Sequence, residues 1–117
     1  MAKIILKIKD QTLREIILYK DAVTTIGRNP SSNIYLENPA VSRSHAKIYR
    51  QGWTFYIVDL ESSNGTFLNG RKVKWKAGLS NNDEITISKY TLIFKDHRSD
   101  YEDVKTDKPD DTIIIKR

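Results

Sequence analysis

The chain has 117 residues, with 20 Lys and Arg, 15 Asp and Glu, and no cysteine. This length predicts one domain, the lack of cysteine excludes disulfides, and no apolar run approaches the roughly 20 residues of a membrane-spanning helix. The net charge of +5 combines fifteen basic and eight acidic residues in 1–95 with five basic and seven acidic residues in 96–117. We therefore expect a cytoplasmic protein that makes no membrane contact and favours anionic partners.

The first half of the chain is patterned like β-structure. In residues 3–9, Ile4, Leu6 and Ile8 fall on one face, which is the two-residue period of a strand. Short runs rich in β-branched or alternating residues predict further strands at residues 14–19, 22–26, 34–36 and 46–49.

The second half continues this pattern. The nearly continuous apolar run at residues 53–60 predicts a central strand covered on both faces, with Trp53 in the core, whereas Trp75 is expected at the surface. Asn69-Gly70 between two strand-like runs predicts a hairpin, because both turn positions need positive φ. Residues 84–88 and 90–95 complete a set of eight to eleven short strands, which indicates an all-β sandwich.

The composition changes near Asp96. We expect residues 1–95 to form the folded domain and residues 96–117 to form an acidic, flexible C-terminal tail, because this stretch holds few apolar residues. Thr112 follows two aspartates and precedes three isoleucines, which makes it a candidate phosphorylation site. Phosphorylated Thr112 would be a ligand for this domain or for a neighbouring copy, which would then self-associate through the tail. The alternative is that the segment leads into a further region.

Three polar clusters follow strand-like runs: Gly27-Arg28, Ser42-Arg43-Ser44-His45 and Ser63-Asn64-Gly65. A phosphate monoester offers three acceptor oxygens and about −1.5 to −2 charges at pH 7. Arginine matches it with a planar, permanently charged fork, and a hydroxyl and exposed loop amides can add donors. The clusters in this order predict a surface that binds phosphorylated peptide.

Each cluster alone also has a structural interpretation. Arg28 could be a turn residue with a solvated charge, Ser42 could cap a turn, and Asn64-Gly65 could be nothing but a turn. A lone histidine is more often structural than a ligand. We expect His45 to hydrogen-bond loop backbone and to fix the shape of the loop that carries Ser42 and Arg43.

No arrangement of residues predicts catalysis. The chain has two histidines and no cysteine nucleophile, and its Asp, Glu and His residues lack the spacing of a metal site. Asp59 and Glu61 fit a solvated turn better than an acid pair. We therefore expect no enzyme activity, no metal and no cofactor.

The clusters together with Asn69-Gly70 resemble the pattern of the forkhead-associated (FHA) domain family, over about residues 3–95. The resemblance implies an eleven-stranded sandwich of two sheets, with a peptide site in the loops at one end. It also implies recognition of phosphothreonine in preference to phosphoserine. The implied partners are phosphothreonine-containing proteins or peptides, and a Ser/Thr protein kinase or its substrates.

The resemblance assigns binding roles to five residues. Arg28 and Ser42 would contact the phosphate, and Arg43 would help to hold the phosphate or the peptide backbone. Ser63 would lie at the edge of the site, and Asn64 would hydrogen-bond the peptide main chain beside the phosphorylated residue.

Other residues would support the site or add selectivity. The resemblance implies that Gly27 and His45 are scaffolding and that Gly65 allows the turn. The third residue after the phosphothreonine usually adds selectivity in this family, and the candidates for contacting it are Pro39, Ala40 and Val41.

Two alternatives stay open from the sequence. One is a scaffold with the same fold that binds unmodified protein through a sheet face. The other is nucleic-acid binding by the basic surface, with Trp53, Trp75 or Tyr90 as stacking platforms. The chain contains no aromatic–basic repeat, which argues against the second alternative.

Overall fold

The computed structural model describes residues 1–96. Asp96, the first residue of the predicted tail, is buried at the end of β11, whereas residues 97–117 with Thr112 lie outside the described residues. The described part contains eleven strands and no helix, as the sequence predicts. The strands are β1 (Ala2–Ile8), β2 (Gln11–Leu18), β3 (Thr24–Gly27), β4 (Ile34–Tyr35), β5 (Ala46–Gln51), β6 (Thr54–Asp59), β7 (Phe67–Leu68), β8 (Arg71–Lys72), β9 (Lys76–Gly78), β10 (Glu84–Ile87) and β11 (Tyr90–Asp96). None of the described residues forms a helix long and apolar enough to cross a membrane.

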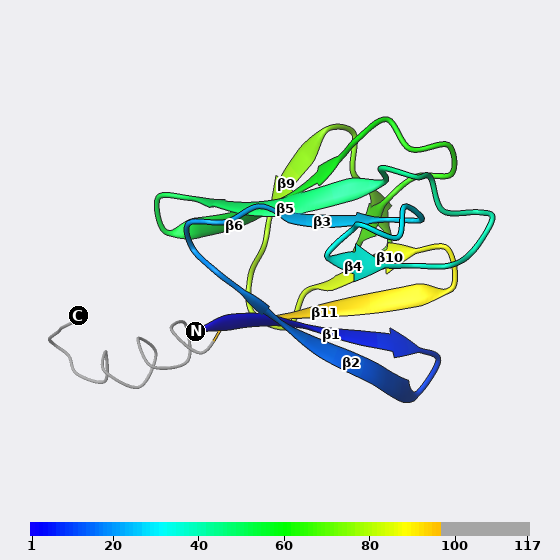
Figure 1. Cartoon of the computed structure of the whole chain (residues 1–117). Helices are drawn as coiled ribbons and strands as arrows, with labels where there is room; N and C mark the ends of the chain where they lie inside the picture. Colours follow the sequence, from blue (N-terminus) through cyan, green and yellow to red (C-terminus); the bar gives the residue numbers. More distant parts are fainter. Residues whose placement is uncertain (97–117) are drawn as a thin grey trace, which may run out of the picture.

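The strands form two sheets that face each other (Figure 1). One sheet has the order β2-β1-β11-β10-β7-β8 and the other has the order β4-β3-β5-β6-β9. Neighbours are antiparallel except β3 and β4, which pair in parallel through Ile26 with Ile34 and Gly27 with Tyr35. The predicted sandwich of two sheets is therefore confirmed.

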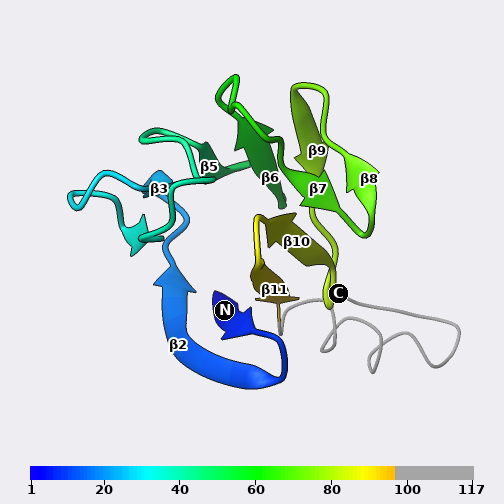
Figure 2. The same ribbon diagram turned by 90° about the vertical axis from the view of Figure 1, so that its right-hand side faces the viewer.

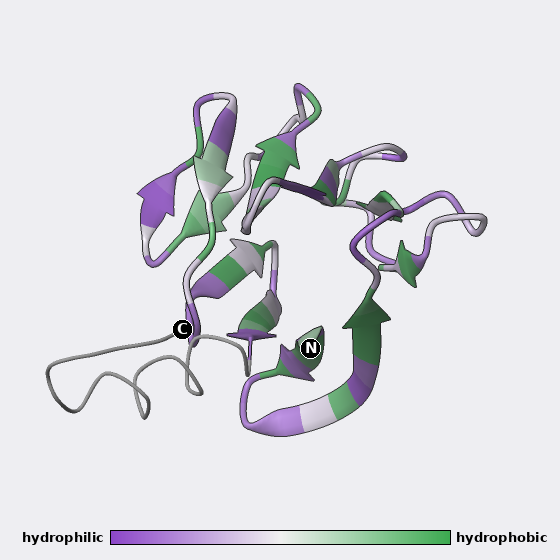
Figure 3. Cartoon of the chain, turned by 90° about the vertical axis from the view of Figure 1, so that its left-hand side faces the viewer, coloured by the Kyte–Doolittle hydropathy of each residue, from purple (hydrophilic) through white to green (hydrophobic). Residues whose placement is uncertain are grey.

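The core lies between the sheets and follows from strand alternation. Hydropathy changes in bands along the strands (Figure 3), because successive side chains point to opposite faces. The rings of Phe55 and Phe94 meet across the sheets at a centroid distance of 5.6 Å. Burial of each large apolar side chain contributes roughly 1.5–3 kcal/mol. The large apolar residues that are at most 1% exposed include Ile4, Ile26, Ile34, Ile48, Ile57, Ile85, Ile87, Leu92 and Phe94.

The prediction for residues 53–60 was partly wrong. Gln51 pairs with Thr54, so Trp53 lies in the two-residue turn between β5 and β6 and is 74% exposed. No third layer of strands covers the outer face of β6 in residues 1–96, where Tyr56 is half-buried and stacks on Tyr49 and Val58 alone is buried. Trp75, by contrast, is exposed as predicted.

The fold brings three loops together at one end of the sandwich. The connections from β3 to β4, from β4 to β5 and from β6 to β7 all lie at this end, which faces the viewer in Figure 2. The N-terminus and the β5–β6 turn lie at the opposite end (Figure 1). The three sequence clusters fall on these loops or at the strand ends beside them, so the topology gathers them on one rim.

Candidate functional site

Backbone hydrogen bonds tie the first two clusters to each other. The Arg28 amide donates to the Ser42 carbonyl at 3.0 Å, and the Asn29 amide donates to the Arg43 carbonyl at 3.2 Å. The His45 amide donates to the Ile26 carbonyl at 3.0 Å. These bonds continue the pairing of β3 and β5 into the loops, which fixes Arg28 beside Ser42 and Arg43.

Gly27 permits this close approach. A Cβ atom at position 27 would lie 2.1 Å from the Arg43 carbonyl oxygen and 3.2 Å from the His45 amide nitrogen. No side chain fits into that space without displacing the backbone of the β4–β5 connection. The glycine thus has a steric role in the site, and it does not touch the open surface, because it is buried.

The guanidinium of Arg28 is oriented by the neighbouring loop. Its Nε donates to the Val41 carbonyl at 3.0 Å, which leaves its two terminal amino groups available for a ligand. Arg28 and the exposed Arg43 line the same hollow, whose volume is about 710 Å³. Two permanent positive charges therefore border one open space.

The third cluster is bonded to the second. The Ser42 hydroxyl oxygen accepts a hydrogen bond from the Ser63 amide at 2.9 Å, so that its own proton can still be donated. The side-chain amide of Asn64 donates to the Ala40 carbonyl at 2.9 Å, while its oxygen can accept a further bond. All five predicted binding residues thus lie together on one rim.

His45 makes the expected bonds to loop backbone. It is completely buried, and its Nδ1 accepts the Ser42 amide at 3.0 Å. Because Nδ1 accepts, Nε2 carries the proton and donates to the Gly65 carbonyl at 3.0 Å. Both ring nitrogens are occupied, so His45 links the second loop to the third and has no nitrogen left to act as a base.

Asp59 has a structural role that the sequence interpretation missed. Its carboxylate accepts from the Ser62 hydroxyl at 2.6 Å, from the Ser62 amide at 3.2 Å and from the Thr66 hydroxyl at 2.8 Å. The Ser62 hydroxyl oxygen in turn accepts the Gly65 amide at 3.0 Å. The network shapes the loop that presents Ser63 and Asn64.

Other residues around the hollow were not predicted. Tyr35 and Glu37 line it, since the parallel pairing of β4 with β3 places them beside Arg28. Pro39 lines it too, but Val41 is buried, so the expectation that Val41 reads a ligand side chain was wrong. Burial, followed by the nearby Glu37 charge, raises the pKa of the Tyr90 hydroxyl.

The arrangement suits binding of an anion. Two guanidinium groups, a hydroxyl and the nearby loop amides can converge on phosphate oxygens, and bonds from charged donors are about twice as strong as neutral ones. Within residues 1–96 no three His, Asp or Glu side chains cluster as metal ligands would. The site therefore offers positive charge and directed donors.

Sequence comparison agrees with this geometry. Residues 24–88 match the family model described as FHA domain. An oxoglutarate dehydrogenase inhibitor of Corynebacterium jeikeium is 44% identical over 77 residues, which are 66% of this chain and 53% of that protein. The glycogen accumulation regulator GarA of Mycolicibacterium smegmatis is 42% identical over 77 residues, which are 66% of this chain and 48% of GarA. The matched region thus spans about half the length of these curated relatives.

Solved structures show the same fold. The FHA domain of CT664 from Chlamydia trachomatis superposes with a TM-score of 0.75 at 26% identity, over 81% of this chain and 96% of that one. Mycobacterium tuberculosis EmbR, solved in complex with a low-affinity phosphopeptide, superposes with a TM-score of 0.68 at 29% identity, over 80% of this chain and 24% of EmbR. This chain belongs to the FHA domain family.

Proposed function

We propose that this chain is a non-catalytic module that binds phosphothreonine-containing protein segments. The observation that carries the proposal is the convergence of Arg28, Ser42 and Arg43 on one rim, within a chain of the FHA family. EmbR, a structural relative, was solved with a phosphopeptide, and the curated relatives are named as an inhibitor and a regulator. These names favour a binding role over an enzymatic one.

Each rim residue has a role in the proposed complex. The terminal amino groups of Arg28 and the hydroxyl proton of Ser42 bind the phosphate oxygens, and Arg43 adds a second charge. The free oxygen of the Asn64 amide accepts from the peptide main chain, and Ser63 lies at the edge. Gly27, His45 and Gly65 hold the loops in this arrangement.

The proposal also names the setting in which the module works. Its partners are proteins phosphorylated by a Ser/Thr protein kinase, or the kinase itself, which places the module in the cytoplasm. The binding domain extends to Asp96, one residue beyond the predicted boundary at residue 95, because Asp96 pairs with Ala2, and the proposed tail begins after it. Phosphorylated Thr112 would be a ligand for the same rim or for that of another copy.

Replacement of Arg28 tests the proposal. We expect Arg28→Ala to weaken binding of a phosphothreonine peptide about ten- to a hundredfold, because a hydrogen bond to a charged group contributes about 1.5–3 kcal/mol. The measurement is isothermal titration with peptides that bear phosphothreonine, phosphoserine or plain threonine in random flanks. Only the phosphorylated peptides should bind, and phosphothreonine should bind more tightly.

Arg71→Ala is the matched control. It removes the same charge from an exposed position in β8, so its affinity for the peptide should stay close to that of the unchanged protein. Equal losses in the two variants would mean that net charge, and no site, drives binding. Binding that ignores phosphorylation but follows salt would point to nucleic acid, and would rule the proposal out.

A second candidate function is favoured by the outer face of the five-stranded sheet. There the ammonium of Lys76 lies 4.7 Å from the Tyr56 ring centroid and 5.1 Å from that of the exposed Trp75, and it donates to the Tyr49 hydroxyl at 3.2 Å. Aromatic residues such as Tyr and Trp are enriched at protein-binding surfaces. The alternative is a scaffold that binds unmodified protein on this face. If the chain has this scaffold function, the Arg28→Ala variant should still bind the partner protein, and the Lys76→Glu variant should not.

A further inference from the structure

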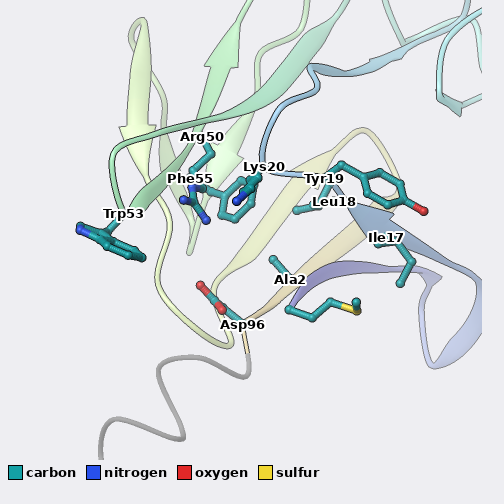
Figure 4. A pocket seen from close by; sticks show the side chains of 10 residues that line it. Ala2, Ile17, Leu18, Tyr19, Lys20, Arg50, Trp53, Phe55 and Asp96 are labelled. Atoms are coloured by element: carbon teal, nitrogen blue, oxygen red, sulfur yellow. The ribbon is translucent and has the colours of Figure 1, made fainter. Parts of the chain in front are cut away.

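A second hollow lies at the end of the sandwich away from the phosphate-binding rim. Its volume is about 470 Å³, and its floor includes the buried side chains of Ala2, Leu18 and Phe55. Figure 4 shows these residues between the first strand and the β5–β6 turn. The hollow shares no lining residue with the one beside Arg28, so it is a separate surface.

The rim of this hollow combines exposed aromatic rings with positive charge. Trp53 is 74% exposed and Tyr19 is 65% exposed, and Lys20 and Arg50 also line the hollow (Figure 4). The Arg50 guanidinium lies 5.4 Å from the centroid of the Trp53 ring. The salt bridge found among residues 1–96 joins Lys3 to Glu15 and involves neither cation, whereas Asp96, which also lines the hollow, has an interaction of its own. An apolar patch with cations at its edge typically marks a binding site.

The chain itself leads from this hollow. Asp96, the last residue of β11, lines it (Figure 4), and the chain continues as Asp100-Tyr101-Glu102-Asp103-Val104. The three carboxylates of this segment complement Lys20 and Arg50, and its two apolar side chains complement the apolar floor, while the Asp96 carboxylate contributes one negative charge to the hollow itself. Residue 104 follows Asp96 by eight positions, which an extended chain spans in about 26–29 Å. The hollow is therefore within reach of this segment.

We propose that residues 100–104 bind the hollow of the same chain. The carboxylates of Asp100, Glu102 and Asp103 face Lys20 and Arg50, while Tyr101 and Val104 cover the floor beside Trp53. Exposed ion pairs are individually weak, so the short tether is essential to the interaction. A tether of this length gives an effective concentration of about millimolar or above, which favours binding within one molecule.

Fluorescence of Trp53 in the full chain tests the proposal. The Trp75→Phe variant leaves Trp53 as the sole tryptophan, because the chain has two. In this background we combine Asp100→Asn, Glu102→Gln and Asp103→Asn. We expect the acrylamide quenching constant of Trp53 to rise roughly twofold. A rise of this size means that the segment occupies the hollow in about half of the unsubstituted molecules. Acrylamide is uncharged, so the changed net charge does not itself alter quenching.

The distal part of the tail provides the matched control. Asp107→Asn, Asp110→Asn and Asp111→Asn remove the same three charges and should leave the quenching constant unchanged. An equal rise in both variants, or a rise in neither, would overturn the proposal. A quenching constant that depends on protein concentration would also overturn it, since the occupant would then come from a second copy.

A charge exchange identifies the contact. Lys20→Glu should raise the quenching constant, and Lys20→Glu combined with Asp103→Lys should lower it again. Failure of the second change to restore protection, with the fold intact by thermal unfolding, would contradict the contact between residues 100–104 and this rim. Phosphopeptide affinity should be the same in all these variants, because Arg28 and Ser42 lie at the other end.

Discussion

At the scale of single residues, the site depends on atoms that a ligand does not reach. His45 is completely buried and joins the Ser42 amide to the Gly65 carbonyl, so one imidazole sets the separation of two loops. Gly27 lets the Arg43 carbonyl approach the β3 backbone. Each buried polar group that loses its hydrogen-bond partner lowers the free energy of unfolding by about 1–3 kcal/mol. Stability and binding are therefore coupled at these positions.

Gly27→Ala should show this coupling. The added methyl group would meet the Arg43 carbonyl at 2.1 Å, so we expect a loss of about 1–3 kcal/mol in the free energy of unfolding, as for other overpacked sites. Urea unfolding measures the loss, and titration with phosphopeptide should show weaker binding in the protein that remains folded.

Gly78→Ala is the control for this variant. Its new Cβ would find its nearest atom, Thr54 Cγ2, at 3.4 Å, which is an ordinary contact, so stability should change little. Equal free energies of unfolding for the two variants would contradict this prediction. They would show that the close contact between Gly27 and the β4–β5 connection does not limit the side chain at position 27.

At the scale of elements, the hairpins are set by local turn geometry. Asn69 and Gly70 connect β7 to β8 with φ angles of 51° and 86°. Two left-handed positions match the right-handed twist of the flanking strands. The Asn69 side chain also accepts the Glu84 amide at 2.9 Å, which ties this hairpin to β10.

Gly70→Ala should destabilise the hairpin. A side chain in the left-handed region costs roughly 1–2 kcal/mol, and we expect a loss of that size in chemical unfolding. Gly70→Asn is the comparison, because asparagine tolerates this region better and should lose less. No difference between alanine and asparagine would show that the turn can change its conformation.

Strands with their own alternation were predictable, whereas β9 was not, because only its pairing with β6 specifies it. β1 and β11 carry their own two-residue pattern, whereas β9 is three residues long and lies in the sheet because Tyr56 and Ile57 pair with Gly78 and Ala77. The apolar neighbours of Trp53 predict a strand at this position, but the pairing of Gln51 with Thr54 makes Trp53 a turn residue.

The candidate site shows the same division. Arg28, Ser42 and Asn64 were named from short motifs, because each motif lies within one loop. Tyr35 and Glu37 line the hollow because β4 pairs in parallel with β3, and no local sequence pattern predicts that pairing. The three bonds accepted by Asp59 likewise require the folded loop.

At the scale of the whole molecule, charge is unevenly distributed. The chain carries a net charge of +5, although residues 96–117 hold more acidic than basic residues. The described part therefore attracts anions from a distance, over a screening length of about 8 Å at physiological ionic strength. In the proposed complex, the hydrogen bonds of the rim then determine which anion remains bound.

Acidification should weaken binding of phosphopeptide. The second pKa of a phosphate monoester is about 6, so the ligand is mostly a dianion at pH 7.5 and mostly a monoanion at pH 5. We expect affinity to fall several-fold across this interval, and to fall with added salt at constant pH. Equal affinity at pH 5 and pH 7.5, in protein shown to be folded at both, would contradict a site built for the dianion.

The pairing of the outermost strands has a practical consequence. Ala2 of β1 lies directly opposite Asp96 of β11, at the end of the molecule far from the phosphate-binding rim. A dye, an affinity handle or a surface linker joined to the exposed Met1, next to Ala2, would project away from that rim and leave its loops unobstructed. An immobilised domain attached in this way would keep the rim that carries Arg28 open to the proposed phosphopeptide ligands.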